Sequence, residues 1–377
     1  MKKKIVVLGA GMVGRTMAAD LSTDFDVTSA DLSDANLALM QKMAKVNTAK
    51  VDFSDAKQIA TAVKDADLVV GAVPGFMGFN MLQTVLEANK NIVDISFFPE
   101  DPFRLDELAK KNGVTAVVDC GVAPGMDNII LGYHYKRMKV SRFLCMVGGL
   151  PVVRNLPWEY KAPFSPIDVI EEYTRPARLV ENGKVVTKPA LSEPELIDFE
   201  QIGTLEAFNT DGLRTLIRFD IPDMAERTLR YPGHIALMKT LRDAGFFSEE
   251  EVTLKSGKVR PIDLTSKILF PQWKYEEGEE DFTVMRVEVE GEENGIPKKY
   301  VYDLLDRYDV ASKTSSMSRT TGYTATAAVH LLMNKTYQKK GIISPEMLGE
   351  EEACFRFMFN HLEARNVVYR IKELAAQ

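Results

Sequence analysis

A glycine-rich turn near the start of the chain limits the possible folds more than any other feature. It reads Gly9-Ala10-Gly11-Met12-Val13-Gly14 and lies between a strand-like run, Ile5–Leu8, and a helix expected from Met12 to about Leu21. This order and spacing are typical of a dinucleotide-binding βαβ unit. Gly9 permits the turn, Gly11 lets a pyrophosphate approach the backbone, and Gly14 lets the helix pack on the strand. The first helical residues, Met12 and Val13, then offer the phosphates a helix N-terminus.

An acid at the end of the second expected strand bears on which dinucleotide binds. The strand-like run from Phe25 to Ala30 ends in Asp31. A carboxylate there accepts hydrogen bonds from the ribose hydroxyls of NAD and repels the additional phosphate of NADP. The sequence therefore favours NAD. NADP remains an alternative cofactor because of Arg15, since a guanidinium near the ribose binds the additional phosphate of NADP.

The rest of the first 121 residues alternates strand and helix signals. Further strands are expected at 49–51, 68–73, 91–95 and 114–118, separated by helix-length segments, which predicts an α/β domain with a parallel sheet. In such sheets ligands bind beyond the carboxyl ends of the strands. The residues expected to line this crevice are Asp52, Phe53, Ala72, Val73, Pro74, Asp94, Ser96, Asp119 and Val122.

The pattern changes after Gly121. Hairpin signals at 181–184, 256–258 and 293–295 alternate with helical stretches near 167–173, 233–244 and 261–269. This predicts an α+β domain with a mostly antiparallel sheet. Helical signals return at 323–334 and after Ser344. We expect a Rossmann domain at 1–121, a substrate and oligomerisation domain at 122–321, and a segment at 322–377 that packs back on the first domain.

Composition argues against several classes of function. The chain has 377 residues with 47 basic and 54 acidic side chains, a formal net charge of −7, and no long basic run. Non-specific nucleic-acid binding is therefore not expected. No stretch is long and apolar enough to span a bilayer. Three widely spaced cysteines and four histidines without metal-ligand spacing predict a protein of the reducing cytoplasm with no metal site.

A succession of short runs from Asp119 onward resembles one known family. The runs are Asp119–Met126, Asn128–Tyr133, Val147–Pro151, Trp158–Tyr160, Phe164-Ser165, Glu206–Thr210, Thr228–His234 and Ser318–Tyr323. Together they resemble the saccharopine dehydrogenase family, and most closely its lysine 6-dehydrogenase branch. Glutamate-forming saccharopine reductases carry an acid at the position of Ala123 and a cysteine at that of Val147. Both departures point towards the lysine dehydrogenase type.

The resemblance implies NAD-dependent oxidation of the side-chain amine of an amino acid, with L-lysine as substrate, a semialdehyde as product and release of ammonia. Such a reaction needs a group that takes the amine's proton and a cation that holds the α-carboxylate. The proton-handling candidates are Asp119, Asp94 and His234, the last because histidine titrates near neutral pH. The substrate-binding candidates are Arg214, Arg230, Asn209, Thr210 and Tyr231.

Plainer roles remain open for these residues. Asp119 also suits a cap of the turn that follows it, and His234 suits a structural place at a helix start. Two other functions also remain open. One is a saccharopine or carboxynorspermidine type of enzyme acting on a secondary amine or imine, and the other is a non-catalytic dinucleotide sensor. The expected partners are a small amino-acid substrate and further copies of the chain, in a homodimer or higher oligomer formed through exposed hairpins.

Overall fold

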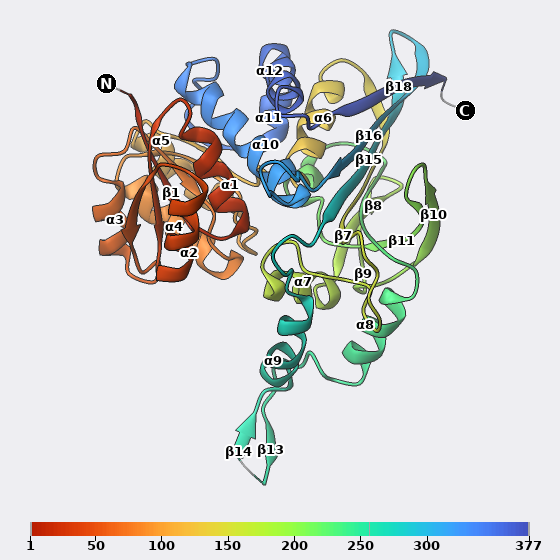
Figure 1. The fold of residues 1–377 in the computed structure, drawn as a ribbon. Coiled ribbons are helices and arrows are strands. Elements are labelled where there is room, and N and C mark those ends of the chain that lie inside the picture. The colour runs from red at the N-terminus through yellow and green to blue at the C-terminus, as the bar shows by residue number, and fades with distance from the viewer. Residues whose placement is uncertain (1, 256, 376–377) are drawn as a thin grey trace. The chain divides into compact units, whose positions relative to one another are not determined.

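The computed structural model describes residues 2–255 and 257–375, which divide into two compact units (Figure 1). The first unit comprises Met1–Met138 and Met317–Tyr369, and the second comprises Lys139–Ser316 and Arg370–Gln377. The first unit therefore continues beyond the expected boundary at residue 121. The reason is helix α6 (Met126–Tyr135), which packs closely on α11 (Pro345–Gly349). A Cβ atom on Gly132 would lie 2.0 Å from the carbonyl oxygen of Glu346.

The first unit is built on a parallel sheet, as the strand and helix alternation predicts. The described strands run in the order β17-β6-β5-β4-β1-β2-β3, and every neighbouring pair is parallel. Their bounds are β1 Lys4–Leu8, β2 Asp26–Asp31, β3 Asn47–Lys50, β4 Leu68–Gly71, β5 Asn91–Asp94, β6 Thr115–Val117 and β17 Gly341–Ile343. From β1 the chain adds β2 and β3 on one side of the sheet and then β4, β5 and β6 on the other side. The glycine turn follows β1, at the strand where this change of direction occurs.

Helices cover this sheet through apolar side chains. Their bounds are α1 Met12–Leu21, α2 Asp34–Met43, α3 Ala56–Val63, α4 Gly75–Glu87, the 3₁₀ helix η1 Pro102–Leu105, α5 Asp106–Lys111, α10 Ser316–Met333 and α12 Glu352–Glu363. Residues of α3, α4 and α5 share one buried cluster with β1, β4, β5 and β6. Helix α10 packs on α1, since a Cβ atom on Gly322 would lie 3.2 Å from Cγ of Met17. It begins at Ser316, earlier than the expected start at Tyr323.

Strand β17 was not expected from the sequence. Its three residues pair in parallel with β6, Gly341 opposite Thr115 and Ile343 opposite Val117. All three are buried. A buried run this short has no alternation to identify it, because strand patterns need about four to eight residues to be recognised. The C-terminal part of the chain thus completes the sheet of the first unit.

The second unit contains a mixed, mostly antiparallel sheet, as predicted. The order of its main path is β10-β11-β12-β7-β15-β16-β18, with β8 pairing β12 and β9, and the β12–β7 pair is parallel. The bounds are β7 Lys139–Pro151, β8 Ala177–Glu181, β9 Lys184–Lys188, β10 Glu195–Phe199, β11 Gly203–Asn209, β12 Asp223–Arg230, β15 Asp281–Glu293, β16 Ile296–Arg307 and β18 Tyr369–Ala375. Because β18 joins this sheet, the last residues differ from the expectation that all of 322–377 packs on the first unit.

Three hairpins were expected in the second unit, and their strands are present. Strands β8 and β9 pair across 181–184, and β15 and β16 pair across 293–296. Between them, β13 (Val252–Leu254) pairs with β14 (Gly257–Val259); Ser256 of the expected turn lies outside the described residues. The helices are α7 Pro166–Thr174, the 3₁₀ helix η2 Arg214–Arg218, α8 His234–Asp243 and α9 Pro261–Trp273. Trp273 lies at the centre of the apolar core of this unit.

None of the helices in residues 2–255 and 257–375 combines the length and the apolar character that a membrane-spanning segment requires.

Candidate functional site

The glycine turn has the geometry that its spacing predicts. Gly9 has a φ of +112°, and a Cβ atom there would lie 2.3 Å from the carbonyl oxygen of Ala72. A Cβ atom on Gly14 would lie 2.0 Å from the carbonyl oxygen of Gly9, so these two glycines are required by close backbone packing. Gly11 has nothing within 4 Å of its Cβ position. Its surroundings are therefore open, which leaves the backbone approachable at the start of α1.

Asp31 is held against this turn at the end of β2. Its Oδ2 accepts a hydrogen bond from the Ala10 backbone N–H at 2.7 Å, and its Oδ1 accepts one from the Ser33 N–H at 2.8 Å. The carboxylate thus fixes both the glycine turn and the start of α2. Arg15 lies close by, donating to the carbonyl oxygen of Ala10 at 2.8 Å. Burial lowers the pKa of Arg15, and the charge of Asp31 opposes that shift.

The other expected cofactor residues lie at the carboxyl ends of neighbouring strands. Ala72, Val73 and Pro74 follow β4, and Pro74 is the N-cap of α4. Asp52 and Phe53 follow β3, and a hydrogen bond from the hydroxyl of Ser54 lowers the pKa of Asp52. The carboxyl ends of parallel strands share one edge of a sheet. The tertiary structure therefore brings these residues to the same edge as the glycine turn.

The two aspartates expected to handle protons are both buried in the first unit. Asp94, the last residue of β5, is fully buried and accepts a hydrogen bond from the hydroxyl of Ser96 at 2.9 Å. The backbone carbonyl oxygen of Asp94 accepts a hydrogen bond from the N–H of Cys120, 3.1 Å away. Asp119, the residue before Cys120, therefore follows a segment that lies beside the end of β5. Asp119 is 2% exposed and has a φ of +52°. Val122, two residues after Cys120, is also buried. The catalytic roles of the aspartates remain predictions.

In the second unit, Arg230 is the centre of a polar cluster whose members are buried except for Glu172, whose side chain is 22% exposed. We call this set, consisting of Arg230, Glu172, Tyr160, Tyr173 and His234, the Arg230 cluster. Arg230 donates to the Glu172 carboxylate at 2.5 Å and, through Nε, to the Tyr173 hydroxyl at 3.2 Å. The Tyr160 ring lies under the guanidinium, 4.5 Å from its carbon to the ring centroid. The charge of Arg230 is thus already balanced by Glu172 inside the protein. Its expected role as a clamp for a substrate carboxylate remains a prediction.

His234 is a neutral member of this cluster. Burial first, and the charge of Arg230 second, lower its pKa from 6.5 to about 3. Its Nδ1 lies 2.8 Å from the carbonyl oxygen of Trp158, and a carbonyl oxygen only accepts, so Nδ1 carries the hydrogen. Its Nε2 therefore accepts from the Tyr173 hydroxyl, 3.0 Å away. Burial beside a cation disfavours the charged form of His234, and its expected role as a proton carrier remains a prediction.

The remaining substrate-binding candidates are distributed over the second unit. Asn209 donates to the Glu193 carboxylate at 2.9 Å, and Thr210 accepts from the hydroxyl of Thr228 at 3.1 Å. Arg214 is half-buried at the start of η2 with a φ of +49°. Tyr231 donates its hydroxyl to the carbonyl oxygen of Pro151 at 2.9 Å. Of these four, Tyr231 is thereby tied to the segment that forms the pocket described next.

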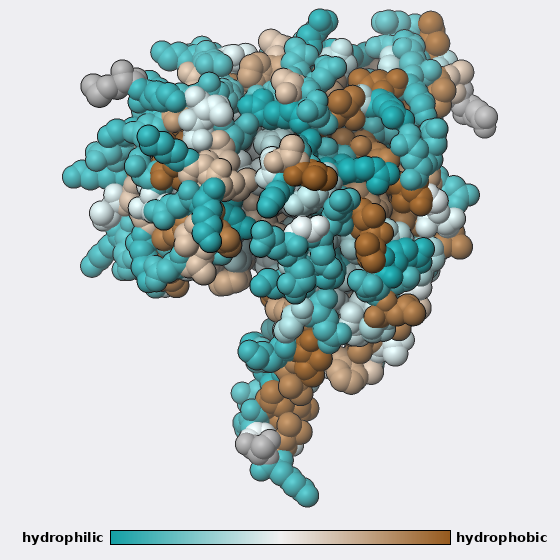
Figure 2. Space-filling view, viewed as in Figure 1, coloured by the Kyte–Doolittle hydropathy of each residue, from teal (hydrophilic) through white to brown (hydrophobic). Residues whose placement is uncertain are grey.

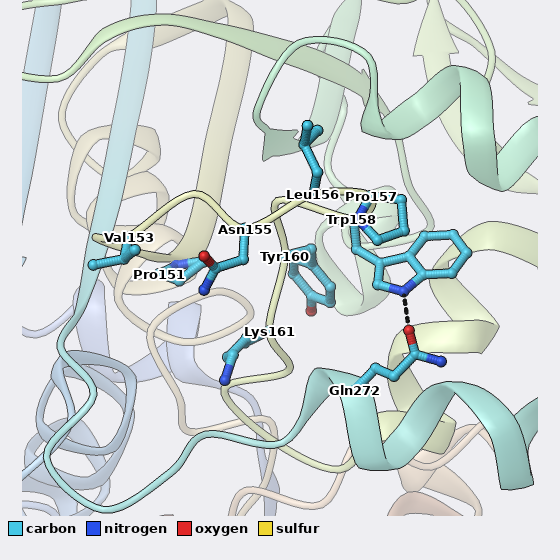
Figure 3. A pocket seen from close by; sticks show the side chains of 9 residues that line it. All are labelled: Pro151, Val153, Asn155, Leu156, Pro157, Trp158, Tyr160, Lys161 and Gln272. Carbon is cyan, nitrogen blue, oxygen red and sulfur yellow. Dashed lines mark hydrogen bonds between the residues drawn. The ribbon is translucent and has the colours of Figure 1, made fainter.

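A pocket of about 90 Å³ lies within the second unit (Figure 3). Its lining residues are Pro151, Val153, Asn155, Leu156, Pro157, Trp158, Tyr160, Lys161 and Gln272. The Trp158 indole donates to Gln272 Oε1 at 2.8 Å, joining the 151–161 segment to α9. The Lys161 ammonium donates to the carbonyl oxygen of Lys274 at 3.0 Å and pairs with Glu279. Tyr160 belongs to both the pocket and the Arg230 cluster.

Several members of this site were not identified from the sequence. Glu172 and Tyr173 are 58 and 57 residues from Arg230, and Gln272 is 114 residues from Trp158. A buried arginine requires an acid, but no local pattern says which acid supplies it. Trp158 and Tyr160, in contrast, belong to one of the short runs that resemble the family in the sequence. The structure adds Lys161 beside them as a cationic group.

Family models match almost the whole chain. The model described as "Saccharopine dehydrogenase NADP binding domain" matches residues 5–117, and "Saccharopine dehydrogenase C-terminal domain" matches residues 121–367. The chain belongs to the saccharopine dehydrogenase family. The resemblance in the sequence to this family is thereby confirmed, and the model that matches the first unit is one named for NADP binding.

Individual relatives are distant in sequence. A saccharopine dehydrogenase [NADP(+), L-glutamate-forming] of Schizosaccharomyces pombe is 24% identical over 90% of this chain and 93% of its own length. An alpha-aminoadipic semialdehyde synthase of Arabidopsis thaliana is 28% identical, but the chain spans only 28% of that protein. It spans 63% of the Pyricularia oryzae saccharopine dehydrogenase. The apo saccharopine dehydrogenase of Saccharomyces cerevisiae shares the fold, with a TM-score of 0.80 at 20% identity, covering 99% of this chain and 100% of that one.

Proposed function

We propose that this protein oxidises the side-chain amine of an amino acid with NAD, converting L-lysine to its semialdehyde and releasing ammonia. The observation that supports the proposal is the composition of the pocket in the second unit. Its nine lining residues include one cation, Lys161, and no acid. The aromatic rings of Trp158 and Tyr160 suit the methylenes of a lysine, and the Lys161 ammonium, which pairs with Glu279 in this structure, would exchange that partner for the α-carboxylate.

The charge of the pocket lining favours an amino acid with one carboxylate over a conjugate with several. Saccharopine carries three carboxylates and would require more cations than the one in the lining. The substitutions at Ala123 and Val147, relative to the glutamate-forming reductases, support the same choice.

The first unit would hold the dinucleotide at the glycine turn. The open backbone at Gly11 and the N-terminus of α1 would receive the pyrophosphate, and Asp31 would face the adenosine ribose. When bound there, the dinucleotide would supply the acceptor for the hydride that leaves the amine-bearing carbon. Water then adds to the imine carbon and the carbon–nitrogen bond breaks, giving aldehyde and ammonia. A base must take a proton from the amine first, and Asp119 and Asp94 are the proposed groups.

A second candidate is a saccharopine type of reaction with NADP. It is favoured by the names of the relatives, several of which are NADP-dependent saccharopine dehydrogenases. Arg15 supports the use of NADP in this second candidate. Its guanidinium lies at the glycine turn near Asp31, where it would bind the 2′-phosphate of NADP.

One set of assays distinguishes these reactions. The purified chain is mixed with L-lysine or saccharopine and with NAD or NADP, and reduced cofactor and free ammonia are measured together. The proposal predicts turnover with lysine and NAD, with one ammonia released for each NADH formed. If saccharopine is turned over, lysine is not, and no ammonia is released, the second candidate function replaces the lysine reaction. A thermal shift with NAD but no turnover of either substrate would indicate a dinucleotide sensor.

A further inference from the structure

A partly buried ion pair, formed by Lys161 and Glu279, lies at the pocket of the second unit. Much of the face that Figure 2 shows is hydrophilic, and ion pairs on a surface of that kind contribute little to stability. The Lys161 side chain is instead only 15% exposed and lines the pocket, while Glu279, at 32%, lies behind it. Opposite charges attract more strongly where they are withdrawn from water, so this pair is suited to binding a charged ligand.

Backbone groups fix both members of the pair in position. Lys161 Nζ donates to the carbonyl oxygen of Lys274 at 3.0 Å and to the Glu279 carboxylate. An ammonium has three hydrogens, so these two partners leave one for a ligand. Glu279 Oε2 also accepts from the Glu276 N–H at 2.6 Å. Burial raises the pKa of Glu279, but the hydrogen bonds from Lys161 and Glu276 lower it by more, so the carboxylate is ionised at neutral pH.

The hydroxyl of Tyr275 is a further polar group beside this pair. Its oxygen is buried and has no hydrogen-bond partner within residues 2–255 and 257–375. The Lys161 ammonium lies 6.0 Å from the centre of the Tyr275 ring. Burial, together with the charges of Asp281 and Glu279, raises the pKa of Tyr275, so the hydroxyl keeps its hydrogen at neutral pH. A buried hydroxyl without a partner costs free energy, and a ligand that accepts its hydrogen bond removes that cost.

We infer that the Lys161–Glu279 pair recognises the zwitterionic end of an α-amino acid and exchanges one ion pair for two. The α-carboxylate of the ligand replaces Glu279 at the Lys161 ammonium, and its α-ammonium binds the Glu279 carboxylate. The Tyr275 hydroxyl donates to the same α-carboxylate. The inference rests on the proposed function for the remainder of the ligand, an apolar side chain along Trp158 and Tyr160, and it adds the chemical class of the end that is bound.

Charge balance favours a zwitterion over a simple anion or cation at this pair. The pair is neutral before binding, and a zwitterion leaves each charge with an opposite partner. A carboxylate without an α-ammonium would displace Glu279 from Lys161 and leave it only the N–H of Glu276. An amine without a carboxylate would draw Glu279 away from Lys161 in the same manner. Separating a partly buried ion pair is costly when one charge is left unbalanced. The pair therefore selects amino acids over fatty acids and alkylamines of similar length.

Calorimetry with three probes of similar length tests this selection without turnover. L-Norleucine has an α-carboxylate, an α-ammonium and an apolar side chain, whereas hexanoate lacks the ammonium and pentylamine lacks the carboxylate. The full chain is titrated without cofactor and with NADH, because neither condition oxidises an amine. We expect norleucine to bind at least about tenfold more tightly than either of the other probes, as one charge-assisted hydrogen bond provides. Equal binding of norleucine and hexanoate would overturn the inference.

Variants assign this binding to the three groups. Lys161→Met and Glu279→Gln should each weaken norleucine binding by about tenfold or more. The matched controls Lys299→Met and Glu288→Gln change an ion pair of β16 and β15 whose side chains are 24% and 16% exposed, and they should leave the binding intact. Tyr275→Phe should weaken norleucine binding by about threefold to tenfold without lowering the free energy of unfolding, because its hydroxyl has no partner in the described part of the protein.

The outcomes separate this inference from the proposed reaction. Norleucine binding that is lost in Lys161→Met and Glu279→Gln supports the inference even where lysine is not oxidised. Lysine oxidation with an unchanged KM in both variants overturns the inference and leaves the proposed reaction in place. Norleucine binding that is absent from the unchanged protein, or equal in both variants and the unchanged protein, overturns the inference as well.

Discussion

The neutral state of His234 predicts a specific dependence of stability on pH. The imidazole has a pKa of about 3 in the folded protein and 6.5 when unperturbed. Because the folded value is depressed, the unfolded chain binds the additional proton between these two values. The free energy of unfolding therefore rises with pH between about 3 and 6.5, and the stability is lost as the pH falls below 6.5.

The magnitude follows from the width of this window. Each pKa unit corresponds to about 1.4 kcal/mol, and pH 5 lies about one and a half units below the unfolded pKa. Lowering the pH from 7 to 5 should therefore remove about 2 kcal/mol of stability through His234 alone. The full separation of the two pKa values limits the effect to about 5 kcal/mol at lower pH.

Tryptophan fluorescence follows the relevant part of the molecule. The chain has two tryptophans, Trp158 and Trp273, and both are in the second unit. The backbone of Trp158 accepts the hydrogen bond from His234, and the Trp158 and Trp273 rings lie 6.5 Å apart. Urea unfolding followed by this fluorescence, from pH 5 to pH 8, should give the predicted slope.

The variant His234→Gln isolates the contribution of the imidazole. It should be less stable at pH 7 by about 1 to 3 kcal/mol, because buried partners lose their hydrogen bonds. The difference in the free energy of unfolding between this variant and the unchanged protein should decrease by about 2 kcal/mol at pH 5, because glutamine does not titrate. Parallel pH profiles for the unchanged protein and His234→Gln would refute the reasoning.

Five further variants test the glycine turn, Asp31 and the Arg230 cluster. Gly14→Ala should prevent stable folding of the first unit, measured by circular dichroism, because the new methyl group meets a backbone oxygen at 2.0 Å. Gly11→Ala, in open space, should fold normally and weaken dinucleotide binding in calorimetry. Asp31→Ala should raise the dissociation constant of NAD by about tenfold, through lost ribose hydrogen bonds, and that of NADP by less. Glu172→Gln should cost about 3 kcal/mol of stability because it leaves a buried arginine unbalanced. Glu171→Gln, at a neighbouring surface ion pair, should cost under about 1 kcal/mol in the same unfolding assay.

The sheet of the first unit was largely predictable because its signals are local. The glycine turn, the run before it and the acid at Asp31 are all defined by residues within one βαβ unit. Strand β17 was not predictable, since its three residues become a strand only by pairing with β6, more than 200 residues earlier. The early start of α10 at Ser316 was missed for a similar reason. The Ser316 hydroxyl donates to Asp306 at 2.8 Å, a contact between segments that no local helix signal contains.

The candidate site likewise has features that local sequence predicts and features that depend on distant residues. Arg230 and His234 were named from the sequence because they stand in one short run, but their chemical states depend on distant groups. The acid that balances Arg230 comes from α7, and the carbonyl that fixes the tautomer of His234 comes from the 151–161 segment. Burial then lowers the pKa of His234 far below the range expected of an isolated histidine. The sequence thus identified the reactive residue types without their protonation states.

Three features follow from the amino-acid sequence alone: the family, the parallel dinucleotide-binding sheet, and the glycine turn with Asp31. Each of these depends on spacing along the chain, where neighbours are covalently fixed. Folding is needed to pair Glu172 with Arg230 and to form a pocket with one cation beside Trp158 and Tyr160. Burial, charge pairing and exposed surface are properties of groups far apart in the chain, and folding alone brings them into contact or leaves them uncovered.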